Sequence, residues 1–157
     1  MPLDEAASRR AKIVEAVERD TGIDEAMVAR LVHGFYDRVR ADEVLAPIFN
    51  ARIADWGPHL ERMCDFWSSI ALMTGRYHGQ PMRMHAPLPV SGSHFDRWLD
   101  LFRETAAEIC PPEAAAFFVS RAERIAESLE LGIAGARGEM LRRGERLRPV
   151  ELADGGE

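Results

Sequence analysis

The side chains of this sequence that could do chemistry are its histidines and its larger aromatic residues. Other common chemistries lack their motifs, because the sequence has no glycine-rich phosphate loop, serine nucleophile elbow, HExxH zinc motif or pair of Glu-x-x-His segments. Nucleotide handling, acyl transfer and di-iron chemistry are therefore not predicted. The candidates that remain are these: His33, His59, His78, His85, His94, Tyr36, Trp56, Trp67 and Trp98.

His85 lies in a short segment, Met82–Ala86, that is held between Pro81 and Pro87. A rigid short element that presents a lone imidazole suits a single axial metal ligand. The local pattern alone fits a water-exposed turn histidine equally well. His59 lies near the start of a helical stripe, and at such a position a histidine is more often a half-buried structural residue than a functional one.

Tyr36 and Trp98 each stand within an apolar helix stripe. A phenol and an indole both carry a polar group that needs a hydrogen-bond partner when buried. Both residues could therefore serve a bound ligand, or they could be core aromatics bonded to backbone carbonyls.

Helical periodicity accounts for the elements that must position these residues. Apolar side chains spaced three and four apart predict helices over residues 5–19, 21–40, 55–74, 93–110 and 112–133. Thr21 with Asp24 and Ser93 with Asp96 are the predicted caps. Residues 45–50 are expected to be turn-rich, and residues 75–90 form an irregular stretch of glycine and proline. Since strand and hairpin patterns are missing, the predicted fold class is all-α.

Length and composition predict one soluble domain. The chain has 157 residues, of which 46% are hydrophobic and 29% charged, and its net charge is −6. This charge argues against nucleic acid and anionic membranes as partners. With two cysteines, no signal segment and no long apolar run, a cytoplasmic protein is expected. The predicted division is a helical extension over 1–20, a main domain over 21–134 and a polar, flexible tail over 135–157.

Five separated motifs resemble those of the group III truncated haemoglobins, in the same order and with compatible spacing over roughly residues 24–133. The glycine-glycine motifs of other truncated globins are missing, as is usual for this group. The resemblance implies a truncated globin fold, which is a two-on-two helical sandwich, here with an extra N-terminal helix. The motifs are Phe35-Tyr36-Asp37-Arg38-Val39-Arg40, Pro47-Ile48-Phe49-Asn50, Trp56 to His59 with Phe66-Trp67, Tyr77 to His85, and Phe95 to Phe102.

The resemblance implies haem b as the cofactor and a role for each matching residue. His85 takes the position of the proximal ligand to iron, with its other ring nitrogen donating to a backbone carbonyl or water. Tyr36 and Trp98 take the positions of distal hydrogen-bond donors to bound ligand. His59 takes the distal histidine position, where it could gate the pocket or donate a proton.

The remaining predicted cofactor contacts come from the same motifs. Arg62 is expected to pair with a haem propionate. His33, His78 and His94 match no functional position and are expected to face solvent. The residues expected to wall the porphyrin and exclude water are Phe49, Met63, Phe66 and Trp67.

The function implied is binding of dioxygen, nitric oxide, carbon monoxide or peroxide at a histidine-ligated iron. Two distal donors favour tight oxygen binding, so redox chemistry on the ligand is expected rather than bulk transport. Activity like that of a nitric oxide dioxygenase, supported by an unidentified reductase, competes with peroxidase-like turnover in which His59 is acid and base. The alternative is a haem-free helical interaction module whose aromatic residues are only core.

Overall fold

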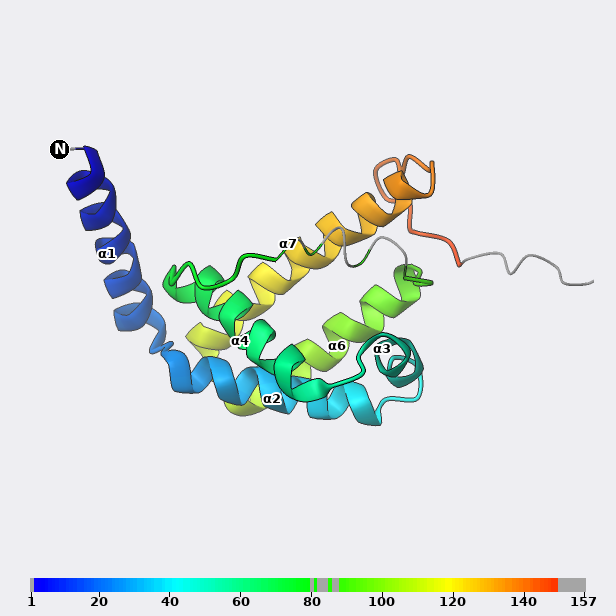
Figure 1. The fold of residues 1–157 in the computed structure, drawn as a ribbon, viewed down its shortest axis with the longest axis horizontal. Coiled ribbons are helices and arrows are strands. Elements are labelled where there is room, and N and C mark those ends of the chain that lie inside the picture. The colour runs from blue at the N-terminus through cyan, green and yellow to red at the C-terminus, as the bar shows by residue number, and fades with distance from the viewer. Residues whose placement is uncertain (1, 80, 82–84, 86–87, 150–157) are drawn as a thin grey trace, which may run out of the picture.

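Helices make up the regular structure of the part of the chain that the computed structural model describes, which is residues 2–79, 81, 85 and 88–149. Within these residues no strand occurs, so the predicted all-α class is confirmed. Figure 1 shows their arrangement. The helices are α1 (Pro2–Thr21), α2 (Glu25–Ala41), α3 (Ala46–Arg52), α4 (Trp56–Leu72), α6 (Gly92–Ile109) and α7 (Pro112–Ala136).

Four long helices form the two-on-two sandwich. Helix α2 packs on α4 and on α6, and α6 packs along α7. Phe35 of α2, Phe102 of α6 and Phe118 of α7 are among the largest fully buried side chains. Burying side chains of this size supplies roughly 1.5–3 kcal/mol each, so these contacts dominate the stability of the sandwich.

Helix α1 is the extra N-terminal helix, and it extends away from the sandwich (Figure 1). It packs against α4 and α7 through partly buried side chains that include Val14 and Val17. Ile13 on the same helix remains 47% exposed. Gly22, with a φ of 73°, ends α1 and lets the chain turn into α2.

Two helix starts differ from those predicted. Asp24, not Thr21, caps α2, since its carboxylate accepts a hydrogen bond from the Met27 N–H at 2.8 Å. Ser91, not Ser93, caps α6 in a capping box whose second member is His94.

Helix α3 replaces the turn that was predicted around residues 45–50. It has 7 residues, none of them fully buried, and so short a run gives periodicity too little to detect. Its start is held by Asp42, whose carboxylate accepts from the N–H groups of Val44 and Leu45 at 3.1 and 3.0 Å. The same carboxylate pairs with Arg97 of α6 at 2.6 Å, which ties α3 to the sandwich.

The chain continues to fold after α7. Leu147 is 2% exposed and packs in a small cluster with Val90, Ile133 and Ala134. The predicted division into extension, domain and tail stays a prediction. Among the described helices, none is both long and apolar enough to cross a membrane.

Candidate functional site

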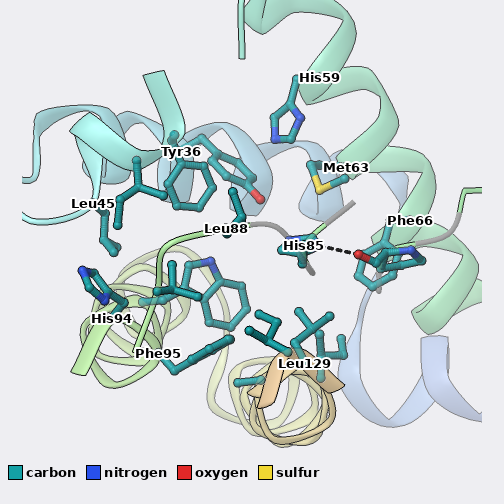
Figure 2. A pocket seen from close by; sticks show the side chains of 18 of the residues that line it. Tyr36, Leu45, His59, Met63, Phe66, His85, Leu88, His94, Phe95 and Leu129 are labelled. Carbon is teal, nitrogen blue, oxygen red and sulfur yellow. Dashed lines mark hydrogen bonds between the residues drawn. The ribbon is translucent and has the colours of Figure 1, made fainter. Parts of the chain in front are cut away.

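An apolar cavity lies between the two helix pairs and the stretch that joins α4 to α6 (Figure 2). About 960 Å³ of empty space, its open mouth included, separates the side chains that line it. Helices α2, α3, α4, α6 and α7 all contribute to the lining. An apolar cavity with a few polar groups is the usual form of a cofactor site.

His85 reaches into this cavity from the stretch between α4 and α6 (Figure 2). Its Nδ1 lies 2.6 Å from the carbonyl oxygen of Pro81. Because a carbonyl only accepts, Nδ1 carries the proton and Nε2 is left with a free lone pair. This is the tautomer that a metal ligand requires. The rest of the segment Met82–Ala86, predicted from the sequence to be a short rigid element, lies outside the described residues.

Tyr36 projects from α2 among aromatic rings. Its ring makes edge contacts with Phe49 and His59 at centroid distances of 6.0 and 5.3 Å, and it is 5% exposed. Its hydroxyl points into the cavity between His59 and His85 (Figure 2). Burial raises the pKa of Tyr36, so the phenol stays protonated and able to donate a hydrogen bond.

His59 projects from the first turns of α4 and carries an unpaired polar atom. Its Nε2 is buried and has no hydrogen-bond partner among the described residues. Burial first, then the nearby charges of Arg62 and His85, lower the pKa of His59 to about 4. The imidazole is therefore neutral at pH 7. Because buried polar atoms are rarely left unpaired, this nitrogen points to a polar guest in the cavity.

Trp98 lines the cavity from α6. Its indole stacks on Phe102 at 5.6 Å and meets the edge of Phe35 at 5.3 Å. These contacts fix the ring at the cavity wall, and the aromatic packing continues to Trp67, which stacks on Phe102 at 5.1 Å.

The structure brings together most of the residues that the sequence singles out. Arg62 is exposed and is not among the lining side chains, so its pairing with a propionate stays a prediction. The roles of the lining residues toward a cofactor stay predictions as well. Those that line the cavity are Tyr36, Phe49, His59, Met63, Phe66, Trp67, His85 and Trp98.

His94 corrects one expectation. Predicted to face solvent, it is half-buried and lines the cavity, whereas His33 and His78 are exposed as predicted. Its Nδ1 accepts a hydrogen bond from the Ser91 N–H at 2.9 Å, which holds the ring at the start of α6. The spacing Ser91-x-x-His94 was a detectable signal, but the neighbouring Ser93-x-x-Asp96 matched the usual capping pattern better.

Haem fits this donor set. Among the described residues no three His, Cys, Asp or Glu side chains gather in a way that could hold a metal ion. Haem carries ring nitrogens of its own for its iron and needs few ligands from the protein, so a single imidazole such as that of His85, with its free Nε2, could suffice. The apolar cavity around it suits the flat apolar body of a porphyrin.

Comparisons with known proteins agree with this site. Residues 20–127 match the family of bacterial-like globins. The chain is 34% identical over 113 residues to the group 3 truncated haemoglobin ctb of Campylobacter jejuni, covering 69% of this chain and 89% of that protein. It is 26% identical over 84 residues to the group 2 truncated haemoglobin YjbI of Bacillus subtilis, and this match covers 52% of this chain and 64% of that protein.

Solved structures give the same result. The group III truncated haemoglobin from Campylobacter jejuni superposes with a TM-score of 0.67 and 30% identity, covering 78% of this chain and 95% of that one. A haemoglobin from the thermophilic bacterium Chloroflexus aurantiacus superposes with a TM-score of 0.60 and 25% identity, and the match covers 80% of this chain and 98% of that one. The chain therefore belongs to the bacterial-like globins, as a truncated haemoglobin of group III. Membership implies a haem cofactor and binding of diatomic ligands such as dioxygen.

Proposed function

We propose that the protein holds haem b through His85, binds dioxygen in the same cavity, and uses the bound ligand for redox chemistry rather than for bulk oxygen transport. The observation that carries this proposal is one apolar cavity into which three polar groups suited to it project. They are the free Nε2 of His85, the hydroxyl of Tyr36 and the unpaired Nε2 of His59. When bound, haem supplies an iron that takes a diatomic ligand and exchanges electrons with it.

His85 would hold the iron, and its neighbour Pro81 would tune that bond. The hydrogen bond from Nδ1 to the Pro81 carbonyl fixes the ring and makes Nε2 a stronger donor of electron density. Phe49, Met63 and Phe66 would wall the porphyrin and keep water away from it. Arg62, exposed on α4, would pair with a propionate carboxylate.

Tyr36 and Trp98 would stabilise the negative charge that dioxygen gains on ferrous iron. A hydrogen bond to a charged acceptor contributes roughly 1.5–3 kcal/mol, so even one such bond slows release considerably. Slow release makes the protein a poor oxygen carrier. It leaves time for a second reactant to arrive.

Nitric oxide is the second reactant that we propose. Dioxygen, nitric oxide and one electron together give nitrate, so the reaction would need a reductase, still unidentified, that supplies one electron per turnover. In this reaction Tyr36 and Trp98 hold dioxygen in place, and His59 stays neutral at pH 7 because its pKa is about 4.

Peroxide reduction is a second candidate, and the unpaired Nε2 of His59 is the observation that favours it. A neutral imidazole can take a proton from the incoming hydrogen peroxide and return it to the oxygen that leaves as water. A reductant would supply two electrons and the solvent two protons, which complete the reduction of hydrogen peroxide to two molecules of water. Substitution of His59 by Gln separates the two candidates, because only peroxide reduction requires this proton transfer.

The first test is the visible absorption spectrum of the purified protein in the ferric, dithionite-reduced and carbon monoxide-treated states. We expect an intense Soret band that shifts sharply with carbon monoxide. A colourless protein that takes up no added hemin would instead support a haem-free interaction module. The second test mixes the reduced, oxygenated protein with nitric oxide. One nitrate per nitric oxide is expected, and nitric oxide left unconsumed would contradict the dioxygenase proposal.

A further inference from the structure

We propose that the segment after α7 acts as a clamp that positions His85. The C-terminal clamp consists of Arg137, Arg146 and Leu147, and it holds the backbone of the described residues that follow His85, from Leu88 to Gly92. The proposal rests on the proposed function, because His85 matters only if it binds haem.

Arg137 bonds directly to this backbone. Its Nη2 donates to the carbonyl oxygen of Leu88 at 2.7 Å and to that of Val90 at 3.1 Å. The Leu88 N–H in turn donates to the carbonyl oxygen of His85 at 3.0 Å. Two hydrogen bonds in series therefore connect the guanidinium group of Arg137 to the backbone of His85.

Arg146 and Leu147 hold the next residues. The Leu147 carbonyl accepts from the Gly92 N–H at 2.8 Å, and Arg146 Nη2 donates to the Gly92 carbonyl at 2.9 Å. Both backbone groups of Gly92 are thus bound to the clamp. The Leu147 side chain is buried against Val90 and completes the contact.

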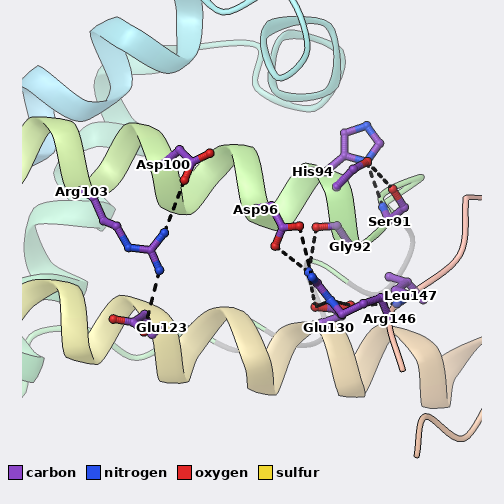
Figure 3. A network of polar contacts seen from close by, with 11 residues as sticks. Ser91, Gly92, His94, Asp96, Asp100, Arg103, Glu123, Glu130, Arg146 and Leu147 are labelled. Carbon is purple, nitrogen blue, oxygen red and sulfur yellow. Dashed lines mark hydrogen bonds and ion pairs between the residues drawn. The ribbon is translucent and has the colours of Figure 1, made fainter. Parts of the chain in front are cut away.

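The clamp is anchored to the sandwich by carboxylates of α6 and α7, as Figure 3 shows. Arg146 pairs with Asp96 at 2.8 Å and with Glu130 at 2.9 Å. Glu130 is 8% exposed and also accepts from the Leu147 N–H at 2.8 Å. A buried carboxylate with this many donors would be costly to leave unpaired, so the clamp is fixed in place.

Gly92 provides the space that Arg146 occupies. A Cβ atom at this position would lie 3.0 Å from Arg146 Cβ and 3.1 Å from its Nε and Cζ. A Cβ atom here would therefore force Arg146 to shift by a few tenths of an ångström against its partners on Gly92, Asp96 and Glu130. The backbone of Gly92 and the side chain of Arg146 therefore pack closely against each other.

The described residues that follow His85 are held from outside. Between the end of α4 and the start of α6, Pro81 and His85 are helical, whereas residues 73–79 and 88–91 are not, so no helix fixes the backbone of residues 88–91. Leu88 lines the cavity itself, next to the site of His85. The three clamp residues lie beyond residue 127, where the match to the globin family ends, so the clamp is not implied by family membership.

Substitution of Arg137 by Ala tests the clamp with three measurements. We expect amide exchange at Leu88 and Val90 in hemin-free protein to accelerate by at least about tenfold, since charge-assisted hydrogen bonds are lost. We expect hemin loss from the loaded protein to become about tenfold faster, as is typical when a supporting contact behind a ligand is removed. The iron–histidine stretching band of the reduced protein should move to lower frequency and broaden.

Arg143→Ala is the matched control, because Arg143 is an exposed arginine of the same segment. Arg137→Lys retains the positive charge, but an ammonium group lacks the rigid, planar geometry with which a guanidinium group binds two carbonyl oxygens. We therefore expect an effect between those of the wild type and Arg137→Ala. Gly92→Ala perturbs the clamp through Arg146 without touching Arg137. It therefore provides a second test if Arg137→Ala fails to fold.

The outcomes separate a positioning role from a stabilising one. If Arg137→Ala lowers only the melting temperature and leaves the iron–histidine band unchanged, the positioning role is wrong. If Arg137→Ala behaves like Arg143→Ala in every measurement, the clamp itself is wrong. If the wild-type chain takes up no hemin, the proposed function fails, and amide exchange at Leu88 and Val90 still decides whether the clamp holds this backbone.

Discussion

The two walls of the cavity are held by different forces. The wall that carries Tyr36, His59 and Trp98 is called the distal wall, and the one that carries His85 the proximal wall, after the roles proposed for them. On the distal wall the rings of Tyr36 and Trp98 pack against the buried Phe35, and the ring of His59 packs against Tyr36. On the proximal wall, His85 lies outside the long helices, and the backbone after it is held by hydrogen bonds from the C-terminal clamp. Burial is non-directional, whereas hydrogen bonds are specific in distance and angle.

This difference separates two kinds of variant. Polar atoms on the distal wall can be removed without disturbing the packing that holds their rings, so ligand chemistry should change while the fold persists. Changes on the proximal wall should instead alter how haem is held. The predictions below test that division, from the largest expected effect to the smallest.

His85→Ala should cause the largest effect. Removal of the axial ligand should weaken hemin binding by at least about 100-fold, the upper end of what loss of a mere supporting hydrogen bond costs. Hemin titration followed by absorbance measures this affinity. His78→Ala is the control, because His78 is exposed in the same stretch of chain. Normal hemin content in His85→Ala would remove His85 from the proximal position.

Tyr36→Phe should speed oxygen release about tenfold to 100-fold, because one hydrogen bond to a charged acceptor contributes about 1.5–3 kcal/mol. Stopped-flow displacement of oxygen by carbon monoxide measures the rate. The melting temperature of hemin-free protein should stay unchanged, since no described residue accepts a bond from this hydroxyl. Tyr77→Phe, the same change at the other tyrosine of the chain, is the comparison, because Tyr77 also lines the cavity but packs beside Phe66 instead of His59. An unchanged release rate in Tyr36→Phe would take the phenol out of the mechanism.

Trp98→Phe should have a smaller effect on the same rate. The indole N–H is a weaker acid than the phenol O–H, so its bond to the same charged acceptor should lie at the lower end of about 1.5–3 kcal/mol, which corresponds to a release about tenfold faster. The same stopped-flow measurement applies. Trp56→Phe is the control, because the Trp56 indole already donates to Asn50 at 3.3 Å. Equal rates in the two variants would show that Trp98 only packs.

His59 should make the stability of hemin-free protein depend on pH. Its pKa is about 4 in the folded chain and ordinarily 6.5. Between these values the unfolded chain binds a proton that the folded chain does not, so stability is complete above pH 6.5 and falls as pH falls toward 4. Allowing for the half-exposed ring, we expect a loss of about 1–2 kcal/mol.

Urea unfolding of the wild-type chain and of His59→Gln at pH 7 and pH 4.5 measures this loss. The variant should lose less stability over this interval, whereas His33→Gln, a change at an exposed histidine, should behave like the wild type. Equal losses in His59→Gln and the wild type would show that this imidazole is protonated in the folded chain as readily as in the unfolded one.

Much of the distal wall could be predicted from the sequence, because it is carried by amphipathic helices. In α4 the spacing of Met63, Phe66 and Trp67 indicates one apolar face, and the structure places all three on the cavity. The motifs shared with truncated haemoglobins added the order of the elements. They also suggested which inward-facing polar residues to single out.

The remaining features depend on contacts between residues far apart in the chain. Helix α3 has no buried face and is held by Asp42 and Arg97, which are 55 residues apart. Arg137 and Leu88 are separated by 49 residues. Since a surface arginine is usually just solvated, nothing local to Arg137 indicates its carbonyl partners. Such partners become visible only when the fold brings the two segments together.

The aromatic packing around the cavity has an optical consequence. All three tryptophans of the chain lie at or beside the cavity: Trp67 and Trp98 line it, and Trp56 meets the edge of His59 at 5.5 Å. Haem absorbs in the region where indoles emit, so its arrival should quench nearly all of the intrinsic fluorescence. The chain thus carries its own emission-based sensor of cofactor occupancy, and hemin uptake and loss can be followed without an attached dye.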